Sequence, residues 1–380
     1  MRHLHFTQSL EPLNGGGLGS STVSLHRQMR QQGIASVLCA THGGTAQNLA
    51  EGSFEFRRIN PYFIYYSPEM RRRAPDLVKG ADVVHGHGFY TGTNYVMGSE
   101  ARKQRKPLVY HVHGMFEPYI LSRSRWKKQI VHTLFENDNF RYVRLWRALT
   151  SKEADQIRGC GLTQPIVVAP NGISMATLEK PENMSQPIVT ELVPELEKSR
   201  FRALFLGRIH PKKGLDMLVP AWSKLGGITK DWQLIIAGPD ELGHMAEIRE
   251  LVRSFGLEEQ VLFTGAVKGE TRLRLLHSAD LFILPSYSEG FPMGVLEAAA
   301  CSVPVVATSA CNFPDLSAAN AGWECEATAD SLLQTLEKAL KSEASERLSR
   351  GRNGHHLVKG KYTWESVVGT LTGACEEACR

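Results

Sequence analysis

Residues 281–307, LFILPSYSEGFPMGVLEAAACSVPVVA, contain the pattern that decides the fold of this chain. The apolar run Leu281–Leu284 has the length of a buried strand, and a second such run follows at Val305–Ala307. Between them, a turn ending at Pro292 initiates a helix that contains Glu297, because proline fits the first turn of a helix. A strand, a helix and a second strand in this order predict a unit of parallel β-sheet.

The same alternation of short β-rich runs and longer helical stretches extends along the chain and predicts an α/β protein. With 380 residues, of which 42% are hydrophobic, the chain can bury two cores of ordinary size. Each half has the element order of a doubly wound, Rossmann-like domain. Further strands are expected at Arg2–Thr7, Ala35–Thr41, Asp82–His85, Leu108–His113, Ile166–Ala169, Arg202–Leu206, Gln233–Ala237 and Val261–Thr264, and helices at Ser20–Gln32 and Tyr95–Arg105.

A candidate linker separates the two halves. After Pro170-Asn171-Gly172 the chain enters Glu179–Ser199, which is rich in Pro and Glu and contains no strand candidate. We therefore place an N-terminal domain at residues 1–178 and a C-terminal domain at residues 179–361. Ligands of doubly wound sheets bind beyond the carboxyl ends of the strands, so an active site is expected between two facing domains.

Charge is distributed unevenly, with 23 Lys/Arg against 13 Asp/Glu in residues 1–180 and 21 against 26 in the remainder. A basic N-terminal half suits an acidic acceptor or an anionic membrane face, with an ordinary solvated basic surface as the alternative. No stretch approaches the roughly 18 apolar residues of a membrane-spanning helix, and MRHLHFTQSL lacks the apolar core of a secretory signal. The sequence predicts a cytoplasmic protein, with peripheral contact to the inner face of the plasma membrane left open, reduced cysteines and no nucleic-acid partner.

The segment Phe54–Arg73 mixes aromatic with basic side chains. Such a mixture could form a membrane-surface patch. It has no clean amphipathic period, so ordinary aromatic packing in a strand and a helix start is favoured. The side chains concerned are Tyr62, Phe63, Tyr65, Tyr66, Arg71, Arg72 and Arg73.

A glycine-rich loop, Gly15-Gly16-Gly17-Leu18-Gly19, follows the first strand and opens a helix. Because glycine has no side chain, the backbone at Gly16 and Gly17 could approach a phosphate at the helix N-terminus. The loop departs from the strict dinucleotide fingerprint, and no acidic residue ends the strand Ala35–Thr41 for a ribose contact. A bound NAD is therefore disfavoured, and no other cofactor is indicated.

Two cations follow the strand at the start of the second half. Arg208 comes directly after Leu206-Gly207, and Lys213 lies a few residues further along the same loop. A guanidinium with paired donors and a compact ammonium, both at the carboxyl end of a strand, suit a diphosphate. The alternative is two solvated loop cations without a ligand.

Two glutamates, Glu289 and Glu297, stand eight residues apart within residues 281–307. Carboxylates accept hydrogen bonds from sugar or ribose hydroxyls, and free backbone N–H groups at a helix start can face a phosphate. The turn that would supply them is Gly290-Phe291-Pro292-Met293. For Glu289 the alternative is a capping or surface carboxylate.

Histidines occur in two pairs at strand ends, His85 with His87 and His111 with His113. Alternate residues of a strand share a face, so a metal site is conceivable, but nothing else in the sequence has ligand spacing. The chain also contains no Asp-x-Asp motif, which other sugar transferases use to hold Mg²⁺ or Mn²⁺. We therefore expect no metal, and Arg208 with Lys213 would balance the charge of a diphosphate.

Taken in order, these motifs resemble those of family-four glycosyltransferases with the GT-B fold, and the resemblance covers most of the chain. One difference is Ser302, where that family commonly has glycine. The motifs are GGGLG at 15–19, HGMFEP at 113–118, APNGI at 169–173, FLGRIHPKKGLD at 205–216, IIAGPDE at 235–241 and LPSYSEGFPMGVLEAAACSVPVV at 284–306.

The resemblance implies roles for individual residues. His113 would hydrogen-bond the donor sugar, Glu289 would hold the distal hydroxyls of that sugar, and Glu297 would hold the ribose diol. Gly16 and Gly17 would close over the diphosphate. It also implies that residues 362–380, which begin Tyr362-Thr363-Trp364, form a helix that crosses back to the N-terminal domain, and that Phe54–Arg73 and Phe116–Arg147 lie on the acceptor side.

The expected function is transfer of a sugar, with retention of configuration, from a UDP- or GDP-sugar to a hydroxyl. The acceptor would be a glycan, a lipid-linked or a small molecule, in bacterial polysaccharide or glycolipid synthesis. Two alternatives remain. A nucleotide-sugar epimerase of the same architecture would use the donor cleft without an acceptor, and a bilobal solute-binding protein would need an export signal, which we do not expect here.

Overall fold

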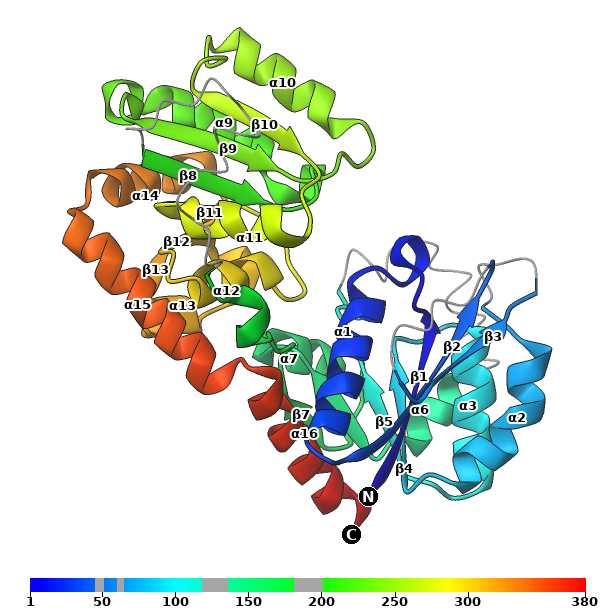
Figure 1. The fold of residues 1–380 in the computed structure, drawn as a ribbon. Coiled ribbons are helices and arrows are strands. Elements are labelled where there is room, and N and C mark those ends of the chain that lie inside the picture. The colour runs from blue at the N-terminus through cyan, green and yellow to red at the C-terminus, as the bar shows by residue number, and fades with distance from the viewer. Residues whose placement is uncertain (45–50, 60–64, 118–135, 181–200) are drawn as a thin grey trace. The chain divides into compact units, whose positions relative to one another are not determined.

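The computed structural model describes residues 1–44, 51–59, 65–117, 136–180 and 201–380. Packing divides the chain into two compact units, Met1–Gly172 with Trp364–Arg380, and Ile173–Thr363 (Figure 1). The first unit therefore ends at Gly172, earlier than residue 178, and takes up the C-terminal helix from Trp364 onwards. Most of the expected linker Glu179–Ser199 lies outside the described residues.

The N-terminal unit is built on a seven-stranded parallel sheet with the order β3-β2-β1-β4-β5-β6-β7. The first three strands pair side by side, and the chain then returns to the other edge of β1, which is the doubly wound arrangement. The strands are β1 (Arg2–Ser9), β2 (Ala35–His42), β3 (Ser53–Arg57), β4 (Val83–His87), β5 (Leu108–His111), β6 (Leu145–Ala148) and β7 (Ile166–Val168).

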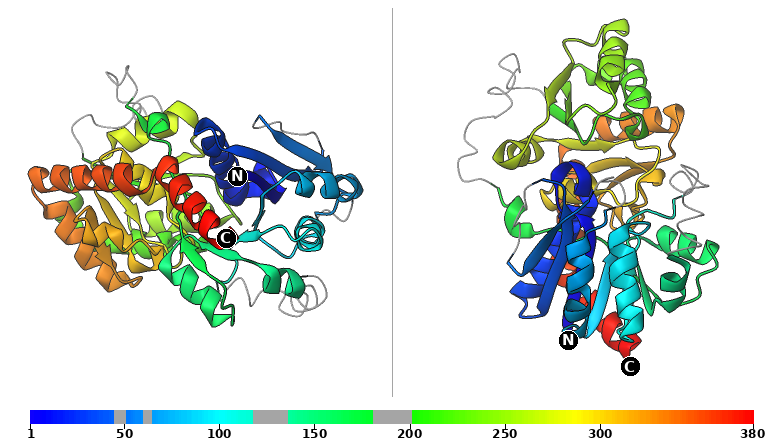
Figure 2. Two further views of the ribbon diagram at one scale, coloured as in Figure 1. Left: turned by 90° about the horizontal axis from the view of Figure 1, so that it is seen from below. Right: turned by 90° about the vertical axis from the view of Figure 1, so that its right-hand side faces the viewer.

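Helices cover both faces of this sheet (Figure 1, Figure 2). Because side chains alternate along a strand, Leu4 and Phe6 of β1 join the core with α2 and α3, whereas Val83 and Val109 join a second core with α1 and α16. The helices are α1 (Pro12–Gln31), α2 (Pro68–Lys79), α3 (Gly92–Lys103), α6 (Asn137–Tyr142), α7 (Ser151–Gly159) and α16 (Trp364–Cys379).

The prediction of a glycine-rich loop at residues 15–19 was wrong, because these residues lie in helix α1. The helix begins at Pro12 and not near Ser20, so Gly16 and Gly17 lie inside it. Proline fits this first helical position, and from the fifth residue onwards the N–H groups of a helix bond to its own carbonyls. The backbone at Gly16 and Gly17 is therefore not presented to a phosphate in this structure. Gly19 has a packing role, since a Cβ there would lie 2.9 Å from the carbonyl oxygen of Ser9.

The C-terminal unit has a six-stranded parallel sheet with the order β10-β9-β8-β11-β12-β13, which is the Rossmann order. Its strands are β8 (Phe201–Leu206), β9 (Trp232–Ala237), β10 (Val261–Gly265), β11 (Leu281–Leu284), β12 (Val305–Thr308) and β13 (Gly322–Cys325). Its α-helices are α9 (Leu215–Lys224), α10 (His244–Ser254), α11 (Gly269–Ser278), α12 (Met293–Ala300), α13 (Asp315–Ala318), α14 (Ala329–Lys341) and α15 (Ala344–Lys361). The short 3-10 helices are η3 (Met175–Leu178), η4 (Pro211–Lys213), η5 (Gly226–Thr229) and η6 (Ser309–Cys311).

The segment that suggested the fold forms β11, α12 and β12 as expected, with one local difference. Helix α12 begins at Met293, so Pro292 caps the helix from outside its first turn. Ser302, at the position where glycine is common in the resembling family, adopts φ +62°, a left-handed conformation that favours glycine. Within the described part of the chain, no helix is both long and apolar enough to cross a membrane.

We predict that α16 is required for the stability of the N-terminal unit. Leu371 of α16 is fully buried in the core shared with α1, so Leu371→Ala should lower the free energy of unfolding by about 2–5 kcal/mol. Leu348→Ala on α15 is the matched control, because Leu348 is 64% exposed and its removal should cost less than about 0.5 kcal/mol. Urea unfolding would measure both, and equal stabilities of the two variants would contradict this role of α16.

Candidate active site

The polar cluster of the C-terminal unit centres on an ion pair between Lys213 and Glu289. The Lys213 Nζ lies 2.6 Å from the Glu289 Oε1, and the two side chains are only 16% and 12% exposed. The Ser286 hydroxyl donates to the same oxygen at 2.5 Å. Lys213 comes from η4 after β8, whereas Ser286 and Glu289 follow β11, the neighbouring strand. Both predicted residues are therefore brought together at the carboxyl edge of the sheet, where ligands of this fold bind.

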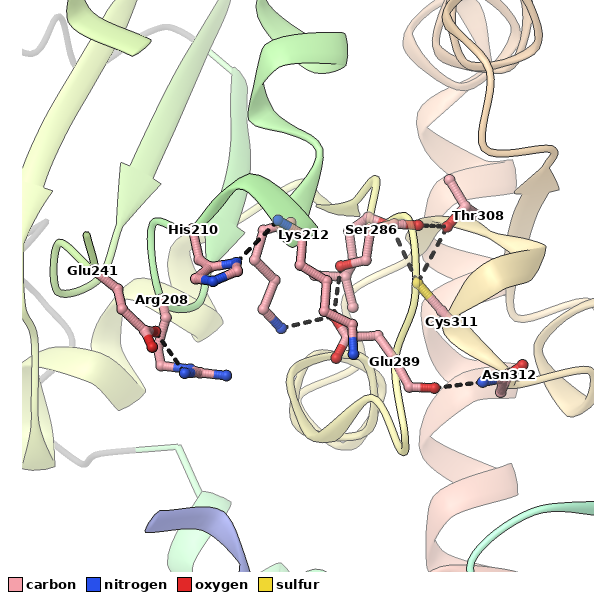
Figure 3. A network of polar contacts seen from close by, with 11 residues as sticks. Arg208, His210, Lys212, Glu241, Ser286, Glu289, Thr308, Cys311 and Asn312 are labelled. Atoms are coloured by element: carbon pink, nitrogen blue, oxygen red, sulfur yellow. Dashed lines mark hydrogen bonds and ion pairs between the residues drawn. The ribbon is translucent and has the colours of Figure 1, made fainter. Parts of the chain in front are cut away.

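Backbone contacts fix the two loops that carry this ion pair (Figure 3). His210 accepts a hydrogen bond from the Lys212 N–H at 3.0 Å, and the Lys212 carbonyl accepts one from the Tyr287 N–H at 2.9 Å. The next residue but one, Gly214, adopts φ +70°, and a Cβ there would lie 2.1 Å from the Pro285 carbonyl oxygen. Only glycine fits this approach, so the two loops keep a fixed register.

The loop after β12 fixes the backbone of Glu289. The Glu289 N–H donates to the Ala310 carbonyl at 3.0 Å, and the Asn312 side-chain amide donates to the Glu289 carbonyl (Figure 3). Beneath this loop, burial raises the pKa of the Cys311 thiol to about 11, so the thiol is protonated at neutral pH and is not a nucleophile. Glu289 is thus oriented from three loops, and sequence reasoning found neither Ser286 nor Asn312.

Arg208 does not share the carboxylate of Lys213. Its NH1 lies 2.5 Å from the Glu241 Oε2, and Arg208 is 61% exposed (Figure 3). An exposed pair of this kind contributes about 0–1 kcal/mol, so the guanidinium can leave Glu241 for a phosphate at little cost. Of the two predicted cations, Lys213 is therefore half-buried and Arg208 is exposed. Glu241 lies in the IIAGPDE motif, but nothing in that motif indicates its partner.

Glu297 lies in the middle of α12 and forms an ion pair with Arg272 of α11. Burial raises the pKa of this carboxyl above its ordinary value, and the Arg272 guanidinium opposes the rise. The contact joins Arg272 to the Glu297 Oε2. Sequence reasoning missed Arg272, and the contact with a ribose diol stays a prediction for Glu297.

The turn before α12 was expected to present backbone N–H groups to a phosphate, and in the structure its Phe291 side chain also packs into an aromatic cluster. The Phe291 ring packs against Phe313 and Tyr362, with ring centroids 6.4 and 6.2 Å apart. Within the turn, the Met293 N–H donates to the Phe291 carbonyl at 3.1 Å. Gly290 and Met293 are half-buried, so the turn is anchored by an aromatic contact while part of its backbone remains accessible.

In the N-terminal unit, His113 lies beyond the end of its strand. The strand β5 stops at His111, and His113 adopts φ +53°, followed by Gly114 at φ +79°. A left-handed conformation at a residue other than glycine costs about 1–3 kcal/mol and is typical of functional sites. The buried carboxylate of Glu153 stabilises this turn by accepting from the Gly114 N–H and, at 2.5 Å, from the Leu149 N–H. Glu153 had no signal in the sequence.

Six histidines, His113 among them, form two hydrogen-bonded rows in the N-terminal unit. Sequence reasoning identified four of them, and the statement that nothing else has ligand spacing was wrong, because His3 and His5 of β1 join the cluster. Burial lowers the pKa of His3 to about 4 and that of His113 to about 3, and it holds the pKa of the other four well below the ordinary value. All six imidazoles are therefore neutral at pH 7.

Neutral imidazoles are metal ligands, and two sets of three lie close enough to share an ion. The sets are His3, His5 and His85, and His5, His87 and His111, with ring nitrogens within 4.8 Å of one another. Their nitrogens already bond to one another at 2.9–3.0 Å, so an ion would have to replace these hydrogen bonds. The absence of a metal therefore stays a prediction.

Solved structures share the architecture of this protein over its whole length. HepE from Anabaena in complex with UDP has a TM-score of 0.80 at 17% identity, covering 99% of this chain and 100% of HepE. WaaG, a glycosyltransferase involved in lipopolysaccharide biosynthesis, has a TM-score of 0.71 at 18% identity, covering 98% of this chain and 100% of WaaG. The protein has the GT-B fold, with two Rossmann-like α/β domains.

Two family models match the chain in succession. The model described as Glycosyltransferase Family 4 matches residues 15–177, and the model described as Glycosyl transferases group 1 matches residues 192–356. Together they cover most of the chain. The protein belongs to glycosyltransferase family 4.

The curated relatives are longer proteins. D-inositol 3-phosphate glycosyltransferase of Actinosynnema mirum is 28% identical over 245 residues, which are 61% of this chain and 57% of the relative. One of the subunits of human phosphatidylinositol N-acetylglucosaminyltransferase is 25% identical over 287 residues, which are 75% of this chain and 55% of the relative. The chain thus spans about half the length of these relatives.

We predict that the buried histidines make the protein acid-labile. In the unfolded chain these groups bind protons below pH 6.5, whereas His3 in the fold stays neutral down to about pH 4. The unfolded state then binds more protons, so this stability is fully present above pH 6.5 and is lost as the pH falls towards 4.

Urea midpoints at pH 7.5 and pH 5 would test this prediction. The wild type should unfold at a lower urea concentration at pH 5 than at pH 7.5. In His85→Leu, which removes one buried imidazole, the urea midpoint should fall by less between the two pH values. His356→Ala on α15 removes an exposed histidine and should behave like the wild type. A midpoint that is the same at both pH values would contradict the prediction.

Proposed function

We propose that this protein is a retaining glycosyltransferase that moves a sugar from a UDP- or GDP-sugar to a hydroxyl of an acceptor. The observation that carries the proposal is the largely buried Lys213–Glu289 ion pair at the carboxyl ends of β8 and β11. It pairs a cation suited to a diphosphate with a carboxylate suited to sugar hydroxyls, within the region matched by the group 1 family model.

The leaving group is a nucleotide diphosphate, and its charge must be stabilised as the glycosidic bond breaks. Lys213 carries three protons and can contact a phosphate oxygen while it still contacts Glu289. Arg208 can exchange Glu241 for the same diphosphate, and the N-terminus of α12 adds the positive end of a helix dipole. The β-phosphate oxygen then accepts the proton of the acceptor hydroxyl on the face from which it departs, which gives retention.

The carboxylates and His113 position the donor in this proposal. Glu289 is oriented by Lys213 and Ser286, and it would accept hydrogen bonds from the distal hydroxyls of the sugar. Glu297 would hold the ribose diol, and His113 would contact a further sugar hydroxyl. Such contacts accelerate transfer by placing the anomeric carbon against the acceptor oxygen.

UDP is the donor nucleotide that the solved relatives favour, because HepE binds UDP and also UDP with glucose. For the acceptor we infer a glycan or a lipid-linked hydroxyl. The excess of Lys and Arg in residues 1–180 supports an anionic acceptor or peripheral contact with a membrane face. Much of the expected acceptor side, including residues 60–64 and 118–135, lies outside the described residues.

We predict release of free nucleotide diphosphate from the donor sugar, with no requirement for a metal. Incubation with UDP-glucose or GDP-mannose, with and without excess EDTA, should give free UDP or GDP at equal rates. An epimerase would return the nucleotide still joined to a sugar, which would contradict transfer. Loss of activity on chelation, with recovery on adding Zn²⁺ or Mn²⁺, would instead implicate the two histidine sets as a metal site.

We predict separate roles for the two glutamates. Glu289→Ala should lower kcat strongly with little change in nucleotide affinity, because its hydrogen bonds place the sugar. Glu297→Ala should weaken binding of the free nucleotide diphosphate by about 1–3 kcal/mol, the value of a charge-assisted hydrogen bond. Calorimetric titration of UDP and GDP would measure both affinities.

Arg272→Ala is the control for Glu297→Ala, because it removes the same ion pair and leaves the carboxylate in place. If Glu297 binds ribose, Arg272→Ala should keep the nucleotide affinity that Glu297→Ala loses. If Glu297 only stabilises its helix, both variants should lose thermal stability and keep the affinity of the wild type, and the assignment would fail.

A further inference from the structure

One of the two histidine rows ends on His113. The Nε2 of His113 lies 3.1 Å from the Nδ1 of His87, and the Nε2 of His87 lies 3.0 Å from the Nδ1 of His5. At the far end, the Nε2 of His5 lies 3.2 Å from the thioether sulfur of Met29 in α1. The row therefore runs from the turn after β5, through β4 and β1, to a buried methionine.

The methionine gives this row a direction. A thioether carries no hydrogen, so in the contact with Met29 the proton must belong to the Nε2 of His5. A neutral imidazole has a single N–H, so the Nδ1 of His5 can only accept, and the Nε2 of His87 must donate to it. By the same step, the Nδ1 of His87 accepts a hydrogen bond from the Nε2 of His113.

This direction of the hydrogen bonds requires that all three imidazole rings are neutral. Burial lowers the pKa of His5 and His87 well below the ordinary value, and that of His113 to about 3. At neutral pH each ring therefore carries one proton. The chain of donors and acceptors then leaves the Nδ1 of His113 without a proton.

We propose that His5 and His87 act as positioning residues that hold His113 in its Nε2–H tautomer, so that its Nδ1 accepts a hydrogen bond from a hydroxyl of the bound donor sugar. His113 is half-buried, and its Nδ1 has no hydrogen-bond partner among the residues that the structure describes. Its left-handed backbone, together with the Glu153 contact to Gly114, fixes the turn that presents this nitrogen. The part of this inference that concerns the sugar rests on the proposed function.

The second row supplies an internal control. There Arg147, which only donates, lies 3.1 Å from the Nδ1 of His111, and the row continues through His85 to His3 at 3.0 and 2.9 Å. Among the described residues, no hydrogen bond joins this row to His113. His85 and His87 lie two residues apart on β4, and both are buried, so the same substitution at the two positions removes similar packing.

The test compares His87→Leu with His85→Leu. In protein with ¹⁵N-labelled histidine at pH 7.5, long-range ¹H–¹⁵N correlation spectra report which ring nitrogen carries the proton. We expect the Nε2–H tautomer of His113 in the wild type and in His85→Leu, and a mixture of tautomers in His87→Leu. With a UDP- or GDP-sugar donor, His87→Leu should lower kcat about 10-fold or more, the worth of one hydrogen bond, with little change in KM. His85→Leu should stay within about 3-fold of the wild type.

His87→Asn is the second variant, because its amide can place an oxygen near the position of the imidazole Nδ1. It should restore part of the Nε2–H signal of His113 and part of kcat, and it keeps the inference testable if His87→Leu does not fold. An Nδ1–H tautomer of His113 in the wild type would overturn the inference. Equal losses of kcat in His87→Leu and His85→Leu would overturn it as well.

The spectra separate this inference from the proposed function. If the wild type transfers no sugar but His113 shows the Nε2–H tautomer and loses it in His87→Leu, the proposed function fails and the control of the tautomer stands. If transfer is measured but the tautomer of His113 is unchanged in His87→Leu, the proposed function stands and the inference fails.

Discussion

Parallel strands must all end at the same edge of their sheet, and the candidate donor site depends on this constraint. Lys213 follows β8, Glu289 follows β11, and Asn312 follows β12, three strands that are adjacent in the sheet although they are far apart in sequence. The Lys213–Glu289 ion pair therefore requires the register of β8 and β11, and Gly214 preserves it by allowing the two loops to touch. A change in strand order would separate the two charges.

Much of the fold and part of the site could be predicted from the sequence, because they depend on local patterns. The strands β8 to β12, the loop with Arg208 and Lys213, and the helix with Glu297 all follow from short apolar runs and their neighbouring residues. The partners of these residues could not be predicted. Arg272, Glu241 and Glu153 meet their partners 25, 33 and 39 residues away, and which pairs form depends on helix placement that the sequence pattern does not contain.

The glycine-rich segment and the histidines show two further limits of prediction from the sequence. Glycine disfavours helices by about 1 kcal/mol, so a run of glycines after a strand indicates a loop, yet Pro12 begins a helix that continues through Gly16 and Gly17. For the histidines, spacing by two residues predicts a shared face within one strand. That β1 lies beside β4 is a property of the whole sheet, and it brings His5 into contact with His87.

If Lys213 and Arg208 stabilise the departing diphosphate, the turnover number of the double variant Arg208→Ala, Lys213→Ala should fall sharply. Arg253→Ala, which removes an exposed cation of α10 from a pair with Glu250, is the control for the loss of charge. With a donor that the wild type uses, and with folding checked by circular dichroism, we expect a kcat at least about 10²-fold lower in the double variant and unchanged in the control. A kcat of the folded double variant within a few-fold of the wild type would show that these two cations do not stabilise the leaving group.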